Sequence, residues 1–219
     1  MTQDESHLCE AIADISLGPI EARWNTVDLC KHIFNDRIPG DMVEAGVFGG
    51  THPIIMSYMG KKYGQPRKVH LFDSFKGIPK VLASEHPHDI KNYGLRAEGE
   101  PITSSGVSVC GRDGVEAYTK QFGGDGSVMV FHEGWFQDTM PGNTIEEIAL
   151  LRVDADLVES LNLCLTHLYP KVVSGGWFVC DDYLSPTCKE VIDKFMEAHK
   201  ITGAEVIGPE RSIIYWKVK

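Results

Sequence analysis

Two adjacent carboxylates, Asp181 and Asp182, end an apolar run in the segment FVCDDYLSP at residues 178–186. Like charges at this spacing repel one another, and burial adds to the cost. A fold that keeps the pair must therefore leave it in water or give it a cation to share. The rest of the chain should indicate which of these two solutions applies.

Acidic or small residues also end the other apolar runs. Glu44 and Gly46 end the first run, Asp73 and Ser74 the second, Glu133 and Gly134 the third, Asp154 and Asp156 the fourth, and Asp181 and Asp182 the fifth. A single acid at such a position could simply cap the following helix, which is worth roughly 0.3–2 kcal/mol. Acids at all the ends are harder to explain in this way, since repeated caps would serve better as Ser or Asn than as carboxylates that repel one another.

The apolar runs alternate with stretches of helical periodicity, which predicts an α/β fold with a Rossmann-like, doubly wound, mainly parallel sheet. We expect about seven strands with helices on both faces, and the last two strand-like runs, AEVIG and SIIYWKV, form a C-terminal antiparallel pair. Ligands of such sheets bind at the carboxyl ends of the strands, where the acids lie. We predict a single domain over residues 1–219, with an N-terminal helical segment at 1–38 and an active-site lid at 76–105.

The composition narrows the class of partner. With 219 residues, 42% of them hydrophobic, the chain can bury a full core, and its net charge of −10 argues against a nucleic-acid surface. No run reaches the ~18 apolar residues of a membrane helix, and MTQDESHLCE lacks the features of a signal peptide, so we expect a cytoplasmic protein with no membrane partner. The six cysteines show no C-x-x-C spacing and are expected to be reduced. A small molecule is the favoured partner, and we expect a homodimer.

The turn EAGVFGGT at residues 44–51 distinguishes between cofactors. A dinucleotide site requires G-x-G-x-x-G with free helix amides for a pyrophosphate, whereas here the spacing differs and Glu44 adds a negative charge. S-adenosylmethionine carries an ammonium and a sulfonium and no phosphate, so it suits this acidic turn better. Asp73, at the end of the second run, is then in a position to accept hydrogen bonds from the ribose hydroxyls.

The segments VEAGVFGGT, LFDSFKGIP, HEGWFQDT, LLRVDADLVES and LYPKVVSGGWFVCDDY resemble, in order and spacing, the macrocin O-methyltransferase family. The resemblance covers the chain from about Gly40 to the C-terminus. It implies a class I methyltransferase domain that uses S-adenosylmethionine to methylate a hydroxyl of a sugar or related small-molecule natural product. It also implies cofactor contacts from Glu44, Gly46, Val47, Gly49, Thr51, Asp73, Ser74, Glu133, Gly134, Trp135 and Asp154, with Asp73 at the ribose and residues 133–135 near the adenine.

The resemblance further implies a magnesium ion held by Asp154, Asp181 and Asp182, which would be the cation that the crowded pair shares. A hard divalent cation takes oxygen ligands and keeps several waters, so carboxylates from two neighbouring strand ends form a suitable half-site. An acceptor hydroxyl at the ion would have a lowered pKa, and a nearby carboxylate could take its proton. Asp154 is predicted to be a ligand and the catalytic base, with Asp156 as the second candidate for the base.

Two departures from the family pattern leave the identity of the acceptor open, and two other functions remain as alternatives. Val158 stands where the family commonly has an aromatic residue, and the segment before the first strand is short, so the acceptor could differ. The D-x-D of residues 154–156 would also suit a metal-dependent glycosyltransferase, and a non-catalytic cofactor-binding subunit is the remaining alternative. Among the histidines, His52 and His132 are the best placed to touch the substrate, because they adjoin the cofactor motifs.

Overall fold

The computed structural model describes residues 1–219, except for the side chain of Arg211. Helices and strands alternate along the chain as the periodicity predicts. In order, they are α1 (Gln3–Ala11), η1 (Ala13–Ile15), α2 (Ile20–Asn35), β1 (Asp41–Ala45), α3 (Thr51–Lys62), β2 (Val69–Asp73), α4 (Pro87–Tyr93), α5 (Arg112–Gln121), η2 (Gly126–Val128), β3 (Met129–Glu133), α6 (Phe136–Thr139), β4 (Ile148–Val153), α7 (Val158–His167), η3 (Tyr169–Lys171), β5 (Val172–Cys180), α8 (Pro186–Ala198), β6 (Glu205–Ile207), η4 (Pro209–Arg211) and β7 (Ile213–Lys217).

The strands form one seven-stranded sheet in the order β3-β2-β1-β4-β5-β7-β6. Strands β1 to β5 pair in parallel, whereas β7 runs antiparallel to both β5 and β6. The strand order reverses between β1 and β4, which is where doubly wound sheets bind their ligands. The prediction of a Rossmann-like, mainly parallel sheet with a C-terminal antiparallel pair is confirmed.

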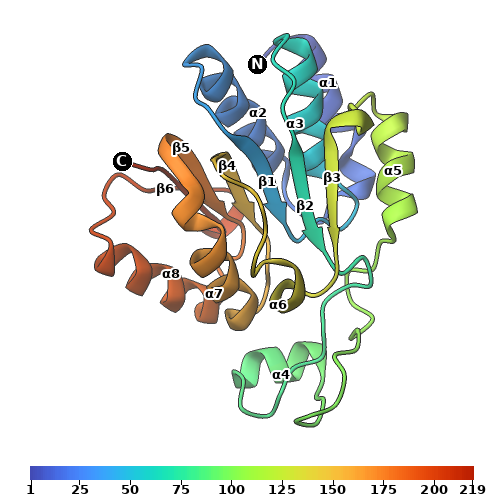
Figure 1. The fold of residues 1–219 in the computed structure, drawn as a ribbon, viewed down its shortest axis with the longest axis vertical. Coiled ribbons are helices and arrows are strands. Elements are labelled where there is room, and N and C mark those ends of the chain that lie inside the picture. Colours follow the sequence, from blue (N-terminus) through green and yellow to red (C-terminus); the bar gives the residue numbers. More distant parts are fainter.

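Helices cover both faces of the sheet, so its central strands are buried on both sides (Figure 1). Every residue of β4 is buried, as expected for a central parallel strand. Met42 of β1 belongs to one hydrophobic core together with residues of α2 and α3, and its neighbour Val43 belongs to a second core with residues of α7 and α8. The strands therefore form a rigid support, and polar side chains gather where the strands end.

Residues 76–105, which we call the lid, project beyond the carboxyl ends of the strands and carry the short helix α4 (Figure 1). Isolated bridges between Pro79 and Ser104, and between Val81 and Leu95, pair parts of this segment with each other. The ring of His86 caps α4, because its Nδ1 accepts a hydrogen bond from the amide of His88. The segment predicted from its length and polarity thus has a helix and backbone pairing of its own.

Two further features concern the hydropathy of the helices and the environment of the thiols. No helix in the described chain is long and apolar enough to cross a membrane. All six cysteines are free, and all but Cys110 are buried. Burial raises the pKa of the Cys30 thiol to about 12, so this group stays protonated at neutral pH.

A buried carboxylate ties the N-terminal helix to the rest of the fold. Glu5 of α1 is 1% exposed and lies 2.7 Å from Lys62 of α3 and 2.8 Å from Lys31 of α2. Burial by itself raises the pKa of this carboxyl, but hydrogen bonds from Lys31, Lys62 and the Thr2 amide together lower it to about 2. Ion pairs, as well as apolar contact, therefore hold α1 on α2 and α3.

We expect Glu5→Gln to lower the free energy of unfolding at neutral pH by ~1.5–3 kcal/mol, the range for hydrogen bonds to charged groups. Because the folded-state pKa lies below the ordinary value of 4.5, this stabilisation is complete above about pH 4.5 and is lost as the pH falls toward 2. Urea unfolding of both proteins from neutral to acid pH measures the difference. The exposed Glu10→Gln on the same helix is the control, and a gap between wild type and Glu5→Gln that does not narrow in acid would contradict the expectation.

Candidate active site

A cavity of about 340 Å³ opens at the carboxyl ends of the strands, beside the start of the lid. Residues 17–19 of the N-terminal segment and residues 212–213 at the start of β7 complete its wall. The predicted site residues that line it are Gly46, Val47, Asp73, Ser74, Gly134, Trp135, Asp154, Asp181 and Asp182, and Asp156 lines it as well. The fold therefore brings most of the predicted site together in one place.

The backbone pairing of the sheet continues past the strand ends and sets the spacing of the acids. The amide of Asp154 donates to the carbonyl of Ala45 at 2.8 Å, and the amide of Asp181 donates to the carbonyl of Val153 at 2.9 Å. Asp154 is thus fixed between the ends of β1 and β5. Two acidic pairs that are far apart in the sequence consequently face the same cavity.

Gly46 allows two of these strand ends to approach closely. Its φ is +85°, and a Cβ atom at this position would lie 1.7 Å from the carbonyl oxygen of Asp154. Glycine alone combines the required backbone freedom with the absence of a side chain. The turn after β1 therefore packs directly against the backbone that carries the Asp154 carboxylate.

The carboxylate of Asp73 holds this glycine turn in place. Its Oδ2 accepts hydrogen bonds from the amides of Val47 at 2.7 Å and Phe48 at 3.3 Å, and its Oδ1 accepts one from Phe75 at 2.7 Å. Burial raises the pKa of Asp73, and these amides oppose the rise. Each carboxylate oxygen has two lone pairs, so Oδ1 can still accept a hydrogen bond from a ligand in the cavity.

Asp182 holds the turn that follows β4. Its Oδ2 accepts hydrogen bonds from the amides of Ala155 and Asp156, each at 2.9 Å. Asp156 adopts a φ of +57°, a left-handed conformation that costs a non-glycine residue roughly 1–2 kcal/mol. Among the described residues, none donates a hydrogen bond to the Asp154 carboxylate, which is therefore available to a ligand in the cavity.

Beneath the acids lies a fully buried arginine that the sequence patterns did not reveal. Arg152 of β4 is 0% exposed, and its Nη2 donates to both carboxylate oxygens of Asp181. Its Nη1 donates to the hydroxyl of Thr26 at 3.2 Å, and its Nε lies 3.9 Å from the carboxylate of Glu44. A charged residue inside the apolar run IALLRV is a signal that could have indicated this buried ion pair, since arginine is rarely buried without a partner.

Burial, and to a lesser extent crowding, raises the pKa of the clustered acids. Burial is the largest cause for Asp154, whose pKa lies well above its ordinary value, and the charges of Asp182 and Asp181 add to the rise. Burial and the neighbouring Asp156 raise the pKa of Asp182 to about 7. For Asp181, burial raises the pKa and Arg152 opposes the rise. The cluster therefore has more carboxylates than Arg152 can neutralise.

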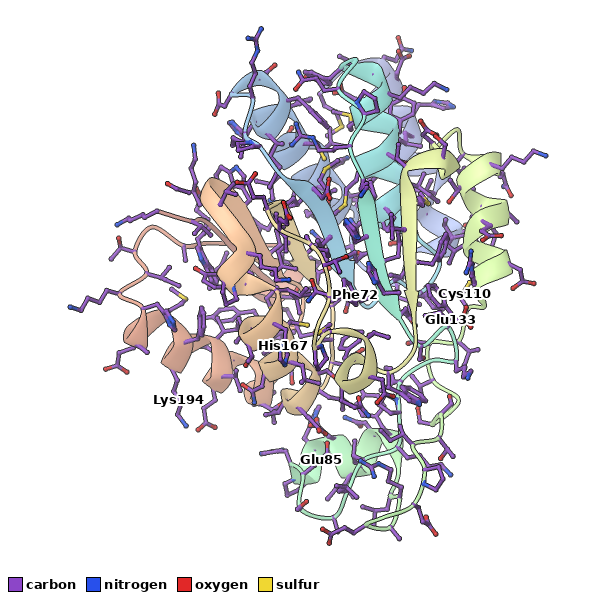
Figure 2. All side chains as sticks on the ribbon, in the orientation of Figure 1. Phe72, Glu85, Cys110, Glu133, His167 and Lys194 are labelled. Carbon is purple, nitrogen blue, oxygen red and sulfur yellow. The ribbon has the colours of Figure 1, made fainter. Side chains whose placement is uncertain are left out.

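Two acids predicted at the cofactor do not line the cavity. Glu44 is 1% exposed and faces Arg152, because its side chain points into the layer covered by α2 and α3. Glu133 lies at the end of β3, about half exposed and 4.0 Å from Arg112 (Figure 2). The neighbour of Glu133, Gly134, does form part of the wall.

Gly49 and Thr51 also lie outside the wall, and both contact the N-terminal segment. The hydroxyl of Thr51 donates to the carbonyl of Ile15 at 3.1 Å. A Cβ atom on Gly49 would lie 2.4 Å from the same carbonyl oxygen. These residues therefore fix residues 17–19 at the mouth of the cavity, a function that the turn motif alone does not indicate.

Neither His52 nor His132 lines the cavity. The Nδ1 of His52 lies 2.8 Å from the Thr26 hydroxyl, and burial lowers the pKa of this imidazole well below its ordinary value. The Nε2 of His132 lies 2.9 Å from Nδ1 of His70, and its ring stacks on Phe72 with 4.0 Å between centroids. Since no histidine is among the described residues of the wall, the carboxylates are the candidates for a base.

In the described part of the chain, no group of three or more His, Cys, Asp or Glu side chains is arranged to hold a metal ion. Arg152 engages both oxygens of Asp181, and two amides engage Oδ2 of Asp182. The Asp154 carboxylate and Oδ1 of Asp182 are free of such bonds to described residues. Asp154 and Asp182 thus each keep an oxygen for a cation. Asp181 would share its oxygens between the cation and the guanidinium of Arg152.

We expect Gly46→Ala to lower the free energy of unfolding by ~2 kcal/mol or more, since the new methyl group collides with the Asp154 carbonyl. Gly203→Ala is the matched control, because Gly203 has a φ of +81° with nothing within 4 Å of its would-be Cβ atom. This control should cost only backbone strain, about 1 kcal/mol. Urea unfolding compares the two, and equal losses would show that the approach of residues 46 and 154 is looser than described.

Comparison with known proteins identifies the family. Residues 21–218 match the family described as Macrocin-O-methyltransferase (TylF). The chain is 32% identical over 198 residues to mycinamicin III 3''-O-methyltransferase of Micromonospora griseorubida, covering 89% of this chain and 75% of the relative. It is also 32% identical over 199 residues to 8-demethyl-8-(2,3-dimethoxy-alpha-L-rhamnosyl)-tetracenomycin-C 4'-O-methyltransferase of Streptomyces olivaceus, covering 89% and 72%.

A solved structure agrees with these sequence matches. The O-methyltransferase NovP has a TM-score of 0.79 and 32% identity, covering 91% of this chain and 80% of that chain. The site described above thus lies in a sequence and a fold that are both shared with named O-methyltransferases. The chain belongs to the macrocin O-methyltransferase family and is an S-adenosylmethionine-dependent O-methyltransferase.

Proposed function

We propose that this enzyme methylates a hydroxyl of a sugar carried by a small-molecule natural product, with the help of Mg²⁺. The observation that carries the proposal is the cluster of Asp154, Asp181 and Asp182, which shares one cavity with the glycine turn after β1. The acceptor class is supported by the relatives, since one is named for methylation of a rhamnosyl-bearing tetracenomycin and another for mycinamicin III.

The methyl donor occupies the side of the cavity formed by Gly46, Val47, Asp73 and Ser74 in this proposal. The free lone pair on Oδ1 of Asp73 supports a ribose contact, and Gly134 with Trp135 provides an apolar, ring-bearing wall for the adenine. Four of the predicted cofactor residues lie outside the cavity wall and do not contact the cofactor directly in this proposal. They are Glu44, Gly49, Thr51 and Glu133.

Magnesium fits the donor set at the other side of the cavity. The available atoms are carboxylate oxygens, which are the ligands that a hard cation prefers. Asp154 and Asp182 have free oxygens, and burial, with the charge of neighbouring carboxylates added to it, raises the pKa of both. Asp154, Asp182 and Asp181 would hold the ion, which when bound supplies a Lewis acid that lowers the pKa of an acceptor hydroxyl.

Transfer forms a bond between the methyl carbon and the acceptor oxygen as the bond to the sulfonium sulfur breaks, and the hydroxyl proton must leave. We assign this proton to Asp154, because it lines the cavity and no described residue donates a hydrogen bond to its carboxylate. Asp156 is the second candidate, because it lines the same cavity without belonging to the proposed ligands. The protein otherwise aligns oxygen, carbon and sulfur and keeps water out.

The glycosyltransferase alternative is disfavoured by the family, since the relatives are named O-methyltransferases. A D-x-D glycosyltransferase binds the diphosphate of a nucleotide-sugar through a divalent cation, with further help from basic side chains. No lysine or arginine is among the described residues that line the cavity, so this further help is missing. We therefore propose methylation of a sugar hydroxyl and not glycosyl transfer.

A cytoplasmic location and a homodimer also remain proposals. Free cysteines that are mostly buried suit a reducing compartment, where disulfides are rare. Size-exclusion chromatography with light scattering would test the dimer.

Calorimetry should detect binding of S-adenosylmethionine and its demethylated product but not of NAD, because the wall is acidic. Asp73→Ala should weaken binding by ~1.5–3 kcal/mol, the range for a hydrogen bond to a charged group. The exposed Asp28→Ala on α2 is the control and should bind normally. Tight binding of NAD, or no heat with S-adenosylmethionine, would rule out the proposed cofactor site.

A chelator should abolish methyl transfer and added Mg²⁺ should restore it, while cofactor binding persists because the proposed cofactor side, formed by residues 46–47 and 73–74, contains none of the proposed metal ligands. Asp182→Asn should reduce turnover by orders of magnitude, since the Lewis acid is lost. It should also stabilise the metal-free protein slightly, because repulsion within the cluster is relieved. Initial rates and thermal melts measure these effects.

Asp181→Asn should have the opposite effect to Asp182→Asn on the stability of the metal-free protein. This change leaves the buried charge of Arg152 without its main partner, so the metal-free protein should lose ~3–5 kcal/mol of stability. Opposite signs for the two asparagine variants would support the division of roles between Asp181 and Asp182. Full activity in EDTA, with normal turnover by Asp182→Asn, would refute the metal mechanism.

A further inference from the structure

One hydrogen bond joins α4 of the lid to the edge of the active site. The phenol of Tyr93 donates to Oδ1 of Asp156 at 3.1 Å. Burial, and next the charge of Asp156, raise the pKa of Tyr93, so this phenol is protonated and is the donor. The contact joins the last residue of α4 to a residue of the cavity wall.

Asp156 is a junction at which three parts of the protein meet. Its amide donates to Oδ2 of Asp182, and its carbonyl accepts a hydrogen bond from the thiol of Cys188 on α8. Its side chain accepts the bond from Tyr93. Because its φ of +57° is unfavourable for a residue with a Cβ atom, these contacts are needed to hold the conformation.

Other parts of the lid lie away from the body of the enzyme. A groove of about 850 Å³ separates residues 82–87 from α7 and α8, with Glu85 on the lid side and Lys194 on α8 (Figure 2). α4 approaches the body with the face that carries Asp89 and Tyr93, which are four residues apart and so lie on one side of the helix. Asp89 is 1% exposed, and its Oδ2 has no hydrogen-bond partner among the described residues. Burial of such a group opposes closure, so the bond from Tyr93 has to offset this cost.

We propose that Tyr93 is a positioning residue through which closure of the lid fixes Asp156 and, through the amide of Asp156, the carboxylate of Asp182. The inference rests on the proposed function, because its value to the enzyme is to complete the acid cluster only when the lid covers the acceptor. Closure of the lid and ordering of the acid cluster then occur together, as parts of one conformational equilibrium.

Tyr93→Phe removes the hydroxyl alone and tests this link. We expect amide hydrogen exchange in α4 to speed up about tenfold or more, because a hydrogen bond to a carboxylate is lost. Methyl transfer at saturating S-adenosylmethionine should slow by a similar factor, while the calorimetric affinity for S-adenosylmethionine stays within about twofold. Tyr215→Phe is the matched control, since it removes an exposed phenol that donates to Glu205 at 2.7 Å on the far strands, and it should change neither quantity.

The same exchange measurement in the Asp156→Gly background, which removes the acceptor and tolerates the φ of +57°, shows whether Tyr93 acts through Asp156. If it does, adding Tyr93→Phe to Asp156→Gly should change the exchange of α4 far less than it does in the wild type. Unchanged exchange in Tyr93→Phe, or an equal acceleration in both backgrounds, would overturn the proposal. Failure of the proposed function would appear separately, as absence of S-adenosylmethionine binding by the wild type, because the exchange experiment needs no turnover.

Discussion

The buried guanidinium of Arg152 is the interaction on which the site depends. It lies under the carboxyl ends of three adjacent strands and offsets part of the charge of Glu44 and Asp181. Removing one partner of such a buried pair typically destabilises a protein by ~3–5 kcal/mol. The stability of the fold therefore depends on this arrangement. Asp154 and Asp182, which it does not neutralise, line the cavity together with Asp181.

The backbone geometry of the strand ends brings these charges together. The side chains then give the two halves of the cavity different polar groups. The absence of a side chain at Gly46 lets β1 approach Asp154, and Asp73 secures the same turn from the neighbouring strand. This half contains polar but already paired groups, which suits a cofactor. The other half contains carboxylates with unused lone pairs, which suits a cation and an acceptor hydroxyl. The lid contacts the wall beside these carboxylates through the hydrogen bond from Tyr93 to Asp156.

Strand alternation and the acids at strand ends were enough to predict the sheet, its antiparallel edge and the acidic part of the cavity wall, because parallel strands end at a common edge. The pattern could not show which acids face the cavity. Glu44 lies in register with Arg152 on the neighbouring strand and under α2 and α3, and this depends on how the helices pack. The contact between Tyr93 and Asp156 joins residues far apart in the chain, and no local signal encodes it.

The central claim is that a divalent cation completes the acid cluster beside the cofactor. Anomalous diffraction from crystals grown with Mn²⁺ and S-adenosylhomocysteine tests it most directly, because Mn²⁺ takes the same oxygen ligands and is located without reference to activity. The account predicts one peak per chain within bonding distance of Asp154 and Asp182. The peak should lie next to Asp181, which is paired with Arg152. An occupied cofactor site with no peak at these carboxylates would contradict it.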